Sequence, residues 1–281
     1  MKEILTRSAT GLVFITVLIG SIVWNKYSVA ILFLFVAMIG LNEFYRLMNK
    51  GGFTPHKLTG FVAGAVIYSL LALHSFGWIP LHTLSIIFPI LVAIVVLELF
   101  RKQGSPVSNI AFTVLSMIYI VMPLASLNYF AYYENFNAEV SESQYEYTVL
   151  LGFFIIIWCN DTGAYCFGRL FGRTKLFERI SPNKTWEGFF GGALTAVGGS
   201  FLFAYITEGN YTHWAIISSL IVVFGTLGDL TESQIKRSVG VKDAGNFLPG
   251  HGGILDRFDG VLYAAPFVLT YFLYIKAESL I

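Results

Sequence analysis

The sequence predicts an all-α polytopic membrane protein with about nine transmembrane helices, its N-terminus in the cytoplasm and its C-terminus outside. Two observations predict this fold class. Hydrophobic residues form 56% of the 281-residue chain and charged residues only 12%, whereas a soluble domain has about 25% charged residues. The apolar segments also reach the length of about 20 residues that spans a bilayer, which disfavours one large soluble helical domain.

Nine segments are long and apolar enough to cross the membrane. They are residues 8–24, 28–48, 58–77, 82–100, 107–127, 147–170, 186–208, 212–232 and 258–276. The first segment lacks the small-residue cleavage site of a signal peptide, so we expect it to be retained as a helix. Gly60 and Gly64 in the third segment have a spacing that lets two membrane helices approach closely, although this spacing is common in such helices.

The connecting loops predict the orientation. With the N-terminus inside, 16 of the 18 Lys and Arg residues lie on the cytoplasmic side, and only Lys26 and Lys276 lie outside. Cytoplasmic loops of membrane proteins carry such an excess of positive charge. The loop over residues 128–147 has four glutamates and no Lys or Arg, which fits an outer loop.

Polarity divides the chain into three parts. Residues 1–80 are N-terminal membrane helices, and residues 81–146 are middle membrane helices followed by the acidic outer loop. Residues 147–281 contain nearly all the unusual polar residues, with cytoplasmic loops at 169–186 and 233–257. Cys159 and Cys166 have neither zinc-ligand spacing nor a disulfide framework, so we interpret them as packing residues.

Asn160 and Asp161 lie inside an otherwise apolar helix. A carboxylate at this position costs about 2.5–3.5 kcal/mol of membrane-insertion free energy. Its presence therefore indicates a structural partner or a functional role. Asp161 could be a packing carboxylate that pairs with another helix. It could instead line a polar cavity, such as a metal or phosphate site.

A basic loop follows, from Arg169 to Lys184. Its five positive charges could simply bind anionic lipid headgroups. However, Ser181-Pro182 before Lys184-Thr185 also resembles a helix start, where phosphates bind readily. Lys184 could then hold a phosphate as a point charge. The loop is not a P-loop, because it lacks the required glycine and lysine spacing.

The most unusual segment runs from Asp229 to Asp259, with nine charged residues between long apolar runs. Four of its side chains recur at i, i+3, i+4 and i+7 and would share one face of a helix. These are Asp229, Glu232, Ser233 and Lys236. Asp256 and Asp259 are also three apart, at the start of the last span. Carboxylates from two helices at the same depth in the membrane are suited to bind Mg²⁺. This ion retains several coordinated water molecules and also binds the phosphates of a substrate.

Between these carboxylates lies a basic, glycine-rich loop. Lys236, Arg237, Lys242 and Arg257 could neutralise phosphates, and the glycines let backbone approach a ligand. His251 could orient a phosphate or transfer a proton, or it could simply bond to backbone. These parts are typical of phosphoryl-type transfer, which needs positioning, cations and a metal more than covalent help.

The segment resembles a known family signature. It reads Ser233-x-x-Lys236-Arg237-x-x-x-x-Lys242-Asp243, then Pro249-Gly-His251-Gly-Gly-x-x-Asp256-Arg257-x-Asp259. This is similar to the signature of phosphatidate cytidylyltransferases (CDP-diacylglycerol synthases). Upstream, Asn160-Asp161-Thr-Gly-Ala-Tyr165 and Ser181-Pro-Asn-Lys184-Thr-Trp-Glu187-Gly also resemble blocks of this family. The resemblance covers about residues 158–260, and the first 150 residues resemble the family only as membrane helices.

The resemblance implies an enzyme that converts CTP and phosphatidic acid to CDP-diacylglycerol and pyrophosphate. It implies a multi-pass protein of a bacterial cytoplasmic membrane, with the active site facing the cytoplasm, a homodimer, and no nucleic-acid partner. Mg²⁺ would bind Asp229, Asp256, Asp259 and the nearby Asp161, with a second or monovalent metal left open. The expected catalytic residues are Asp229, Lys236, Arg237, Asp256 and Asp259. The expected substrate-binding residues are Asn160, Asp161, Lys184, Ser233, Lys242, His251 and Arg257.

Two other functions stay open at this point. A CTP-dependent lipid-alcohol kinase would share the nucleotide, the membrane and the metal, but would release CDP instead of pyrophosphate. An ion-coupled transporter would also place carboxylates in membrane helices. It predicts sites near the midplane and an inverted repeat, and the sequence has neither.

Overall fold

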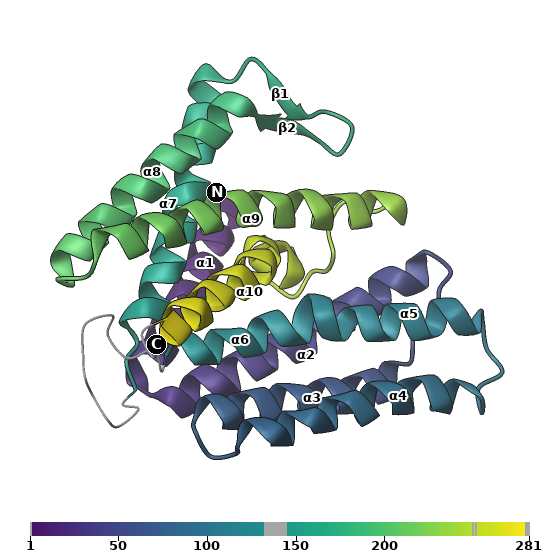
Figure 1. The fold of residues 1–281 in the computed structure, drawn as a ribbon. Helices are drawn as coiled ribbons and strands as arrows, with labels where there is room; N and C mark the ends of the chain where they lie inside the picture. Colours follow the sequence, from purple (N-terminus) through teal and green to yellow (C-terminus); the bar gives the residue numbers. More distant parts are fainter. Residues whose placement is uncertain (1, 132–144, 249, 251, 279–281) are drawn as a thin grey trace. The chain divides into compact units, whose positions relative to one another are not determined.

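The computed structural model describes residues 2–131, 145–248, 250 and 252–278, and these are mostly helical (Figure 1). Within them, eight helical segments are long and apolar enough to cross a membrane, and a shorter apolar stretch, Ala9–Trp24, lies near the N-terminus. The prediction of an all-helical polytopic membrane protein is therefore confirmed. The structure adds one short β-hairpin to it.

By contacts the chain forms two compact units. The first unit comprises residues 1–129 and 235–258, and the second comprises 130–234 and 259–281. The predicted division into three parts follows polarity instead of contacts and stays a prediction.

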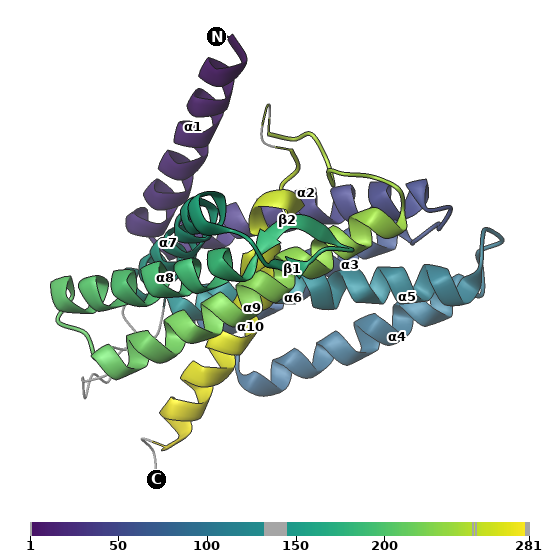
Figure 2. The ribbon, with the colours of Figure 1, turned by 90° about the horizontal axis from the view of Figure 1, so that it is seen from above.

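The first unit is built mainly from six α-helices, one 3₁₀ helix and one π-helical segment. These are α1 (Lys2–Trp24), α2 (Lys26–Lys50), α3 (Lys57–Ser75), the 3₁₀ helix η1 (Leu81–Ile86), α4 (Ile87–Glu98), α5 (Pro106–Ser116), the π-helical η2 (Met117–Val121) and α6 (Met122–Phe130). Asn25 caps α2 by accepting hydrogen bonds from the backbone N–H groups of Tyr27 and Ser28, as asparagine commonly does at this position. Helices α3, α4 and α5 lie side by side (Figures 1 and 2).

A buried polar network joins two loops of the first unit. One carboxylate oxygen of Glu98 accepts a hydrogen bond of 2.8 Å from the Asn109 amide, and the other pairs with His56. Asn109 also donates to the backbone of Gln103 at 2.6 Å. These partners satisfy the buried groups, so the network stabilises the ends of α3, α4 and α5.

The second unit contains four long helices and the hairpin. These are α7 (Thr148–Phe171), β1 (Lys175–Phe177), β2 (Ser181–Thr185), α8 (Trp186–Ile206), α9 (Tyr211–Ser238) and α10 (Leu255–Glu278). The last turn of α9 and the first turn of α10 belong to the first unit. Strands β1 and β2 pair antiparallel and connect α7 to α8 (Figure 1).

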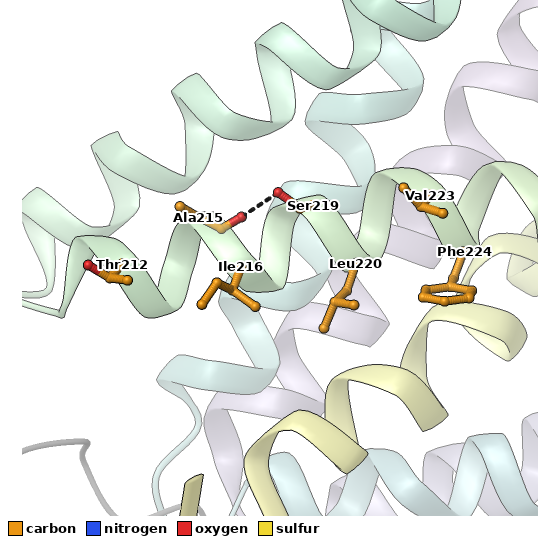
Figure 3. Close-up of a pocket in the computed structure, with 7 residues that line it drawn as sticks. All are labelled: Thr212, Ala215, Ile216, Ser219, Leu220, Val223 and Phe224. Atoms are coloured by element: carbon orange, nitrogen blue, oxygen red, sulfur yellow. Dashed lines mark hydrogen bonds between the residues drawn. The ribbon is translucent and has the colours of Figure 1, made fainter. Parts of the chain in front are cut away.

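One face of α9 lines an open, apolar groove. Figure 3 shows its residues, which are Thr212, Ala215, Ile216, Ser219, Leu220, Val223 and Phe224. The Ser219 hydroxyl donates to the Ala215 carbonyl of the same helix, so it needs no outside partner. Phe224 stacks on Phe267 of α10. A surface of this kind is suited to contact with lipid chains, because its polar groups are satisfied within the helix.

Helices α7 and α8 pack closely because glycines face the partner helix. A Cβ atom on Gly191 would collide with Phe167, and one on Gly192 would lie 2.8 Å from Oδ1 of Asn160. The Thr195 hydroxyl donates across the pair to the Cys159 carbonyl at 2.9 Å. Small residues at such crossings let backbones approach, as is common in membrane helices.

Gly191→Ala is therefore expected to destabilise the protein by about 1–3 kcal/mol, because the added methyl group must displace the base of the Phe167 side chain. The measurement is thermal unfolding of the protein in detergent. Gly198→Ala is the matched control, because it lies on the same helix and a Cβ there meets no atom within 4 Å. Equal unfolding temperatures for the two variants would contradict close packing at Gly191.

Candidate functional site

The polar face predicted on the segment from Asp229 to Lys236 lies on α9, which continues to Ser238. The hydroxyl of Ser233 donates to Asp229 at 3.4 Å, as expected for residues one turn apart. Glu232 and Lys236 are only 2% and 9% exposed. Charged side chains buried to this degree need compensating partners.

A cluster of carboxylates forms within the second unit. Asp259 on α10 interacts electrostatically with Asp229 and Glu232 on α9 and with Asp161 on α7. Gly228 brings α9 and α10 together, since a Cβ there would lie 3.0 Å from Cβ of Tyr263 and would collide with the Asp259 carbonyl. Three helices thus contribute acidic groups that repel one another unless a cation lies among them.

Lys184 supplies one such cation. Its ammonium group forms an ion pair with Asp229, and the two side chains are 25% and 38% exposed. Asn160 donates to the neighbouring Asp161 at 3.4 Å and faces α8 at Gly192. The second unit therefore brings together Asn160, Asp161, Lys184, Asp229 and Asp259 from the predicted set.

The expected helix start at Ser181-Pro182 is wrong. Residues Ser181–Thr185 form strand β2, and α8 begins at Trp186. Thr185 is the N-cap, and its hydroxyl accepts from the Gly188 N–H at 3.2 Å. Glu187 then accepts hydrogen bonds of 3.1 Å from the backbone N–H groups of Arg173 and Thr174, which fixes the start of the hairpin. Pro182 is tolerated because a two-stranded hairpin consists only of edge strands.

The first unit holds a second ion pair. The Asp256 carboxylate accepts a hydrogen bond of 2.6 Å from Lys236 Nζ, and the two side chains are 9% and 11% exposed. It also accepts bonds of 3.0 Å from the Ala244 N–H and 2.8 Å from the Gly253 N–H. Gly252 has a φ of +83°, which favours glycine. Asp256 thus organises the described parts of the loop between α9 and α10.

The other predicted residues lie at the surface. Arg237 donates to the Val241 carbonyl at 3.3 Å and is exposed, as are Lys242 and Arg257. His251 and Pro249 lie outside the described residues, so the expected roles of His251 stay predictions.

A family model describes almost the whole chain. Residues 5–275 match the model of the cytidylyltransferase family. The chain belongs to that family. Similar relatives are phosphatidate cytidylyltransferases of staphylococci. That of Staphylococcus haemolyticus is 36% identical over 248 residues, covering 82% of this chain and 94% of the relative. That of Staphylococcus epidermidis is 34% identical over 239 residues, covering 84% and 87%.

The match to the family model includes almost all of the first 150 residues, where the sequence motifs alone show no specific resemblance. The resemblance to the family, first seen in the segment from Ser233 to Asp259, is confirmed for the chain. In the structure this segment consists of the end of α9, a loop and the start of α10.

The chemistry of the acidic groups fits Mg²⁺ better than a softer metal, because the donors are all carboxylate oxygens. Across the described ranges, however, no three His, Cys, Asp or Glu side chains are arranged to hold one metal ion. Two of the acids also have ammonium partners, Asp229 with Lys184 and Asp256 with Lys236. Metal binding at Asp161, Asp229, Asp256 and Asp259 therefore stays a prediction.

The sequence interpretation missed Glu43 on α2. Its side chain is 3% exposed and accepts a hydrogen bond of 3.0 Å from the Leu255 N–H at the start of α10. A signal was available, because a carboxylate inside an apolar span calls for explanation.

Proposed function

We propose that this chain is a phosphatidate cytidylyltransferase, which transfers the cytidylyl group of CTP to phosphatidic acid and gives CDP-diacylglycerol and pyrophosphate for phospholipid biosynthesis. The observation that carries the proposal is family membership over residues 5–275, with relatives of that name. The grouping of acidic and basic side chains at the ends of apolar helices supports it, since phosphates and a lipid meet most easily there.

The reaction needs little covalent help from the protein. An oxygen of the lipid phosphate forms a bond to the α-phosphorus of CTP, and the bond from that phosphorus to the pyrophosphate oxygen breaks. The lipid phosphate is already anionic near neutral pH, so no strong general base is required. Positioning and charge neutralisation then determine the rate.

Basic side chains supply part of this neutralisation, with Lys184 on the second unit and the others on the first. The proposed set is Lys184, Lys236, Arg237, Lys242 and Arg257. Lys184 and Lys236 are held by carboxylates, which orients their ammonium groups, whereas the exposed residues can adapt to the substrate. Asn160, Ser233 and His251 are proposed as further polar contacts to substrate.

We include Mg²⁺ in the proposal, with Asp229, Asp259 and Asp161 as the residues that would hold it on the second unit. When bound, it would neutralise phosphate charge and polarise the phosphorus–oxygen bonds. Asp256 was also predicted as a ligand, and in the structure its oxygens accept bonds from Lys236 and two backbone N–H groups. Its organisation of the loop is the role best supported by these contacts.

The location is part of the same proposal. The distribution of Lys and Arg supports a site that faces the cytoplasm, where CTP is made. The staphylococcal relatives support a bacterial cytoplasmic membrane. A homodimer is proposed from the family resemblance. Neither the lipid-alcohol kinase nor the transporter is favoured, because the relatives carry the name of cytidylyltransferases.

The test uses purified protein with phosphatidic acid, Mg²⁺ and CTP labelled in its α-phosphate. We expect one pyrophosphate for each labelled CDP-lipid, loss of both products in EDTA, and recovery when Mg²⁺ is restored. Diacylglycerol in place of phosphatidic acid is the control, and it should give no product. Release of CDP with diacylglycerol would support the kinase instead.

A further inference from the structure

Glu43 connects α2 to a loop that lies 212 residues later in the chain. The carboxylate is buried, with only 3% of the residue exposed, and one of its oxygens, Oε2, accepts the Leu255 N–H at 3.0 Å. A buried carboxylate is expensive unless it is compensated. Arg46, one turn along α2, compensates part of this charge, and the remaining close contacts of Glu43 are with the chain between α9 and α10, so its effect should be sought there.

The loop between α9 and α10 has two arms that meet at Glu43. The first arm is residues 240–245 and the second arm is residues 252–255. A Cβ atom on Gly245 would collide with Oε1 of Glu43, and one on Gly253 would lie 2.6 Å from Oε2 and 2.7 Å from the Gly245 nitrogen. The arms therefore touch each other against the Glu43 carboxylate, which leaves space only for glycine at both positions.

Asp256 depends on the same two arms. It accepts the Ala244 N–H from the first arm and the Gly253 N–H from the second, and it holds Lys236 through an ion pair. Both donors are tied to the glycines that pack on Glu43. Ala244 precedes Gly245, and Gly253 is itself one of the two glycines. Moving the arms would therefore move Asp256 and Lys236.

We propose that Glu43 is a positioning residue, which holds the two arms of the loop so that Asp256 and Lys236 keep their orientation toward the phosphates. The catalytic part of this inference rests on the proposed function. Glu43 itself contacts backbone and not the reacting groups. A mutation far from the reacting atoms that displaces a catalytic group by about 1 Å can lower the rate about 100-fold. We therefore expect substitution of Glu43 to lower turnover strongly.

The first measurement does not need activity. Hydrogen exchange of the backbone is followed by mass spectrometry in detergent for wild type, Glu43→Ala, Glu43→Gln and Glu98→Gln. Glu98 is the matched control, because it is also a buried carboxylate of the first unit, 5% exposed, but pairs with Asn109 and His56 instead of the loop. We expect faster exchange over residues 244–255 in Glu43→Ala, a smaller change in Glu43→Gln, which keeps an acceptor oxygen, and no change there in Glu98→Gln.

The second measurement is the kinetics of CTP turnover. Glu43→Ala should lower kcat/KM for CTP by about 10- to 100-fold. Glu43→Gln should lower kcat/KM less. In Glu98→Gln, any loss of kcat/KM should be no larger than its loss of thermal stability explains. Gly245→Ala should be harmful in the wild-type background but add little to Glu43→Ala, because the colliding oxygen is then gone.

Unchanged exchange over residues 244–255 in Glu43→Ala would overturn the proposal. So would activity losses in Glu43→Ala and Glu98→Gln that scale alike with stability. If Glu43→Ala does not fold, Glu43→Gln and Gly245→Ala carry the same comparison. If the wild-type protein makes no CDP-lipid, the proposed function fails, while the exchange experiment still decides whether Glu43 holds the loop.

Discussion

Asp229→Asn should lower the turnover of CTP by at least about 1000-fold, because it removes a negative charge from the group that faces both Lys184 and the proposed cation. Folding should be little affected, since the Asp229 side chain is 38% exposed and its neighbour Asp259 is itself acidic. The measurement is turnover as a function of Mg²⁺ concentration. Any residual activity should need more Mg²⁺ for half-maximal rate.

Glu208→Gln provides the control for this change, because Glu208 is an exposed carboxylate in the turn between α8 and α9. It should leave both turnover and the Mg²⁺ dependence unchanged. Lys184→Met tests the alternative in which Asp229 serves only to orient Lys184. In that case the double variant Asp229→Asn with Lys184→Met would turn over CTP no more slowly than either single variant. Its Mg²⁺ dependence would match that of wild type.

Asp256→Asn should abolish turnover although the protein still folds and inserts. The amide would place its own N–H groups among three donors, which are the ammonium of Lys236 and the backbone N–H groups of Ala244 and Gly253. Loss of one partner of a buried ion pair costs about 3 kcal/mol or more. The measurements are turnover at saturating CTP and thermal unfolding in detergent.

The double variant Asp256→Asn with Lys236→Met separates charge from loop structure. If the unpaired ammonium causes the loss of stability, the double variant should be more stable than Asp256→Asn alone. Turnover should remain absent, because the loop still lacks one of the two carboxylate oxygens that accept hydrogen bonds at Asp256. Wild-type turnover in Asp256→Asn would contradict any role of this carboxylate in the site.

The membrane spans could be predicted because their signal is local. A run of about 20 apolar residues has few alternatives to a membrane helix, and the face shared by Asp229 and Ser233 follows from helical spacing alone. Strand β2 could not be predicted in this way. A serine and a proline before a lysine fit a helix start as well as an edge strand, and hydrogen bonds from Arg173 and Thr174 to Glu187 accompany the hairpin.

The ion partners could not be predicted, because they depend on which helices pack together. Lys184 was expected to bind a phosphate, but spacing does not reveal that it pairs with Asp229. The same is true of Lys236 and Asp256, which join the two ends of the loop. Glu43 is the extreme case, since its partner Leu255 lies 212 residues away and neither position carries a motif that indicates the other.

That separation also has a consequence for biosynthesis. At roughly 5–20 residues per second, the ribosome reaches Leu255 about 10–40 s after it has made Glu43. During that time α2 carries a carboxylate whose backbone partner does not yet exist. The loop can close only after the start of α10 has been made. Nascent chains that end before α10 should therefore be inactive, even when their earlier helices have entered the bilayer.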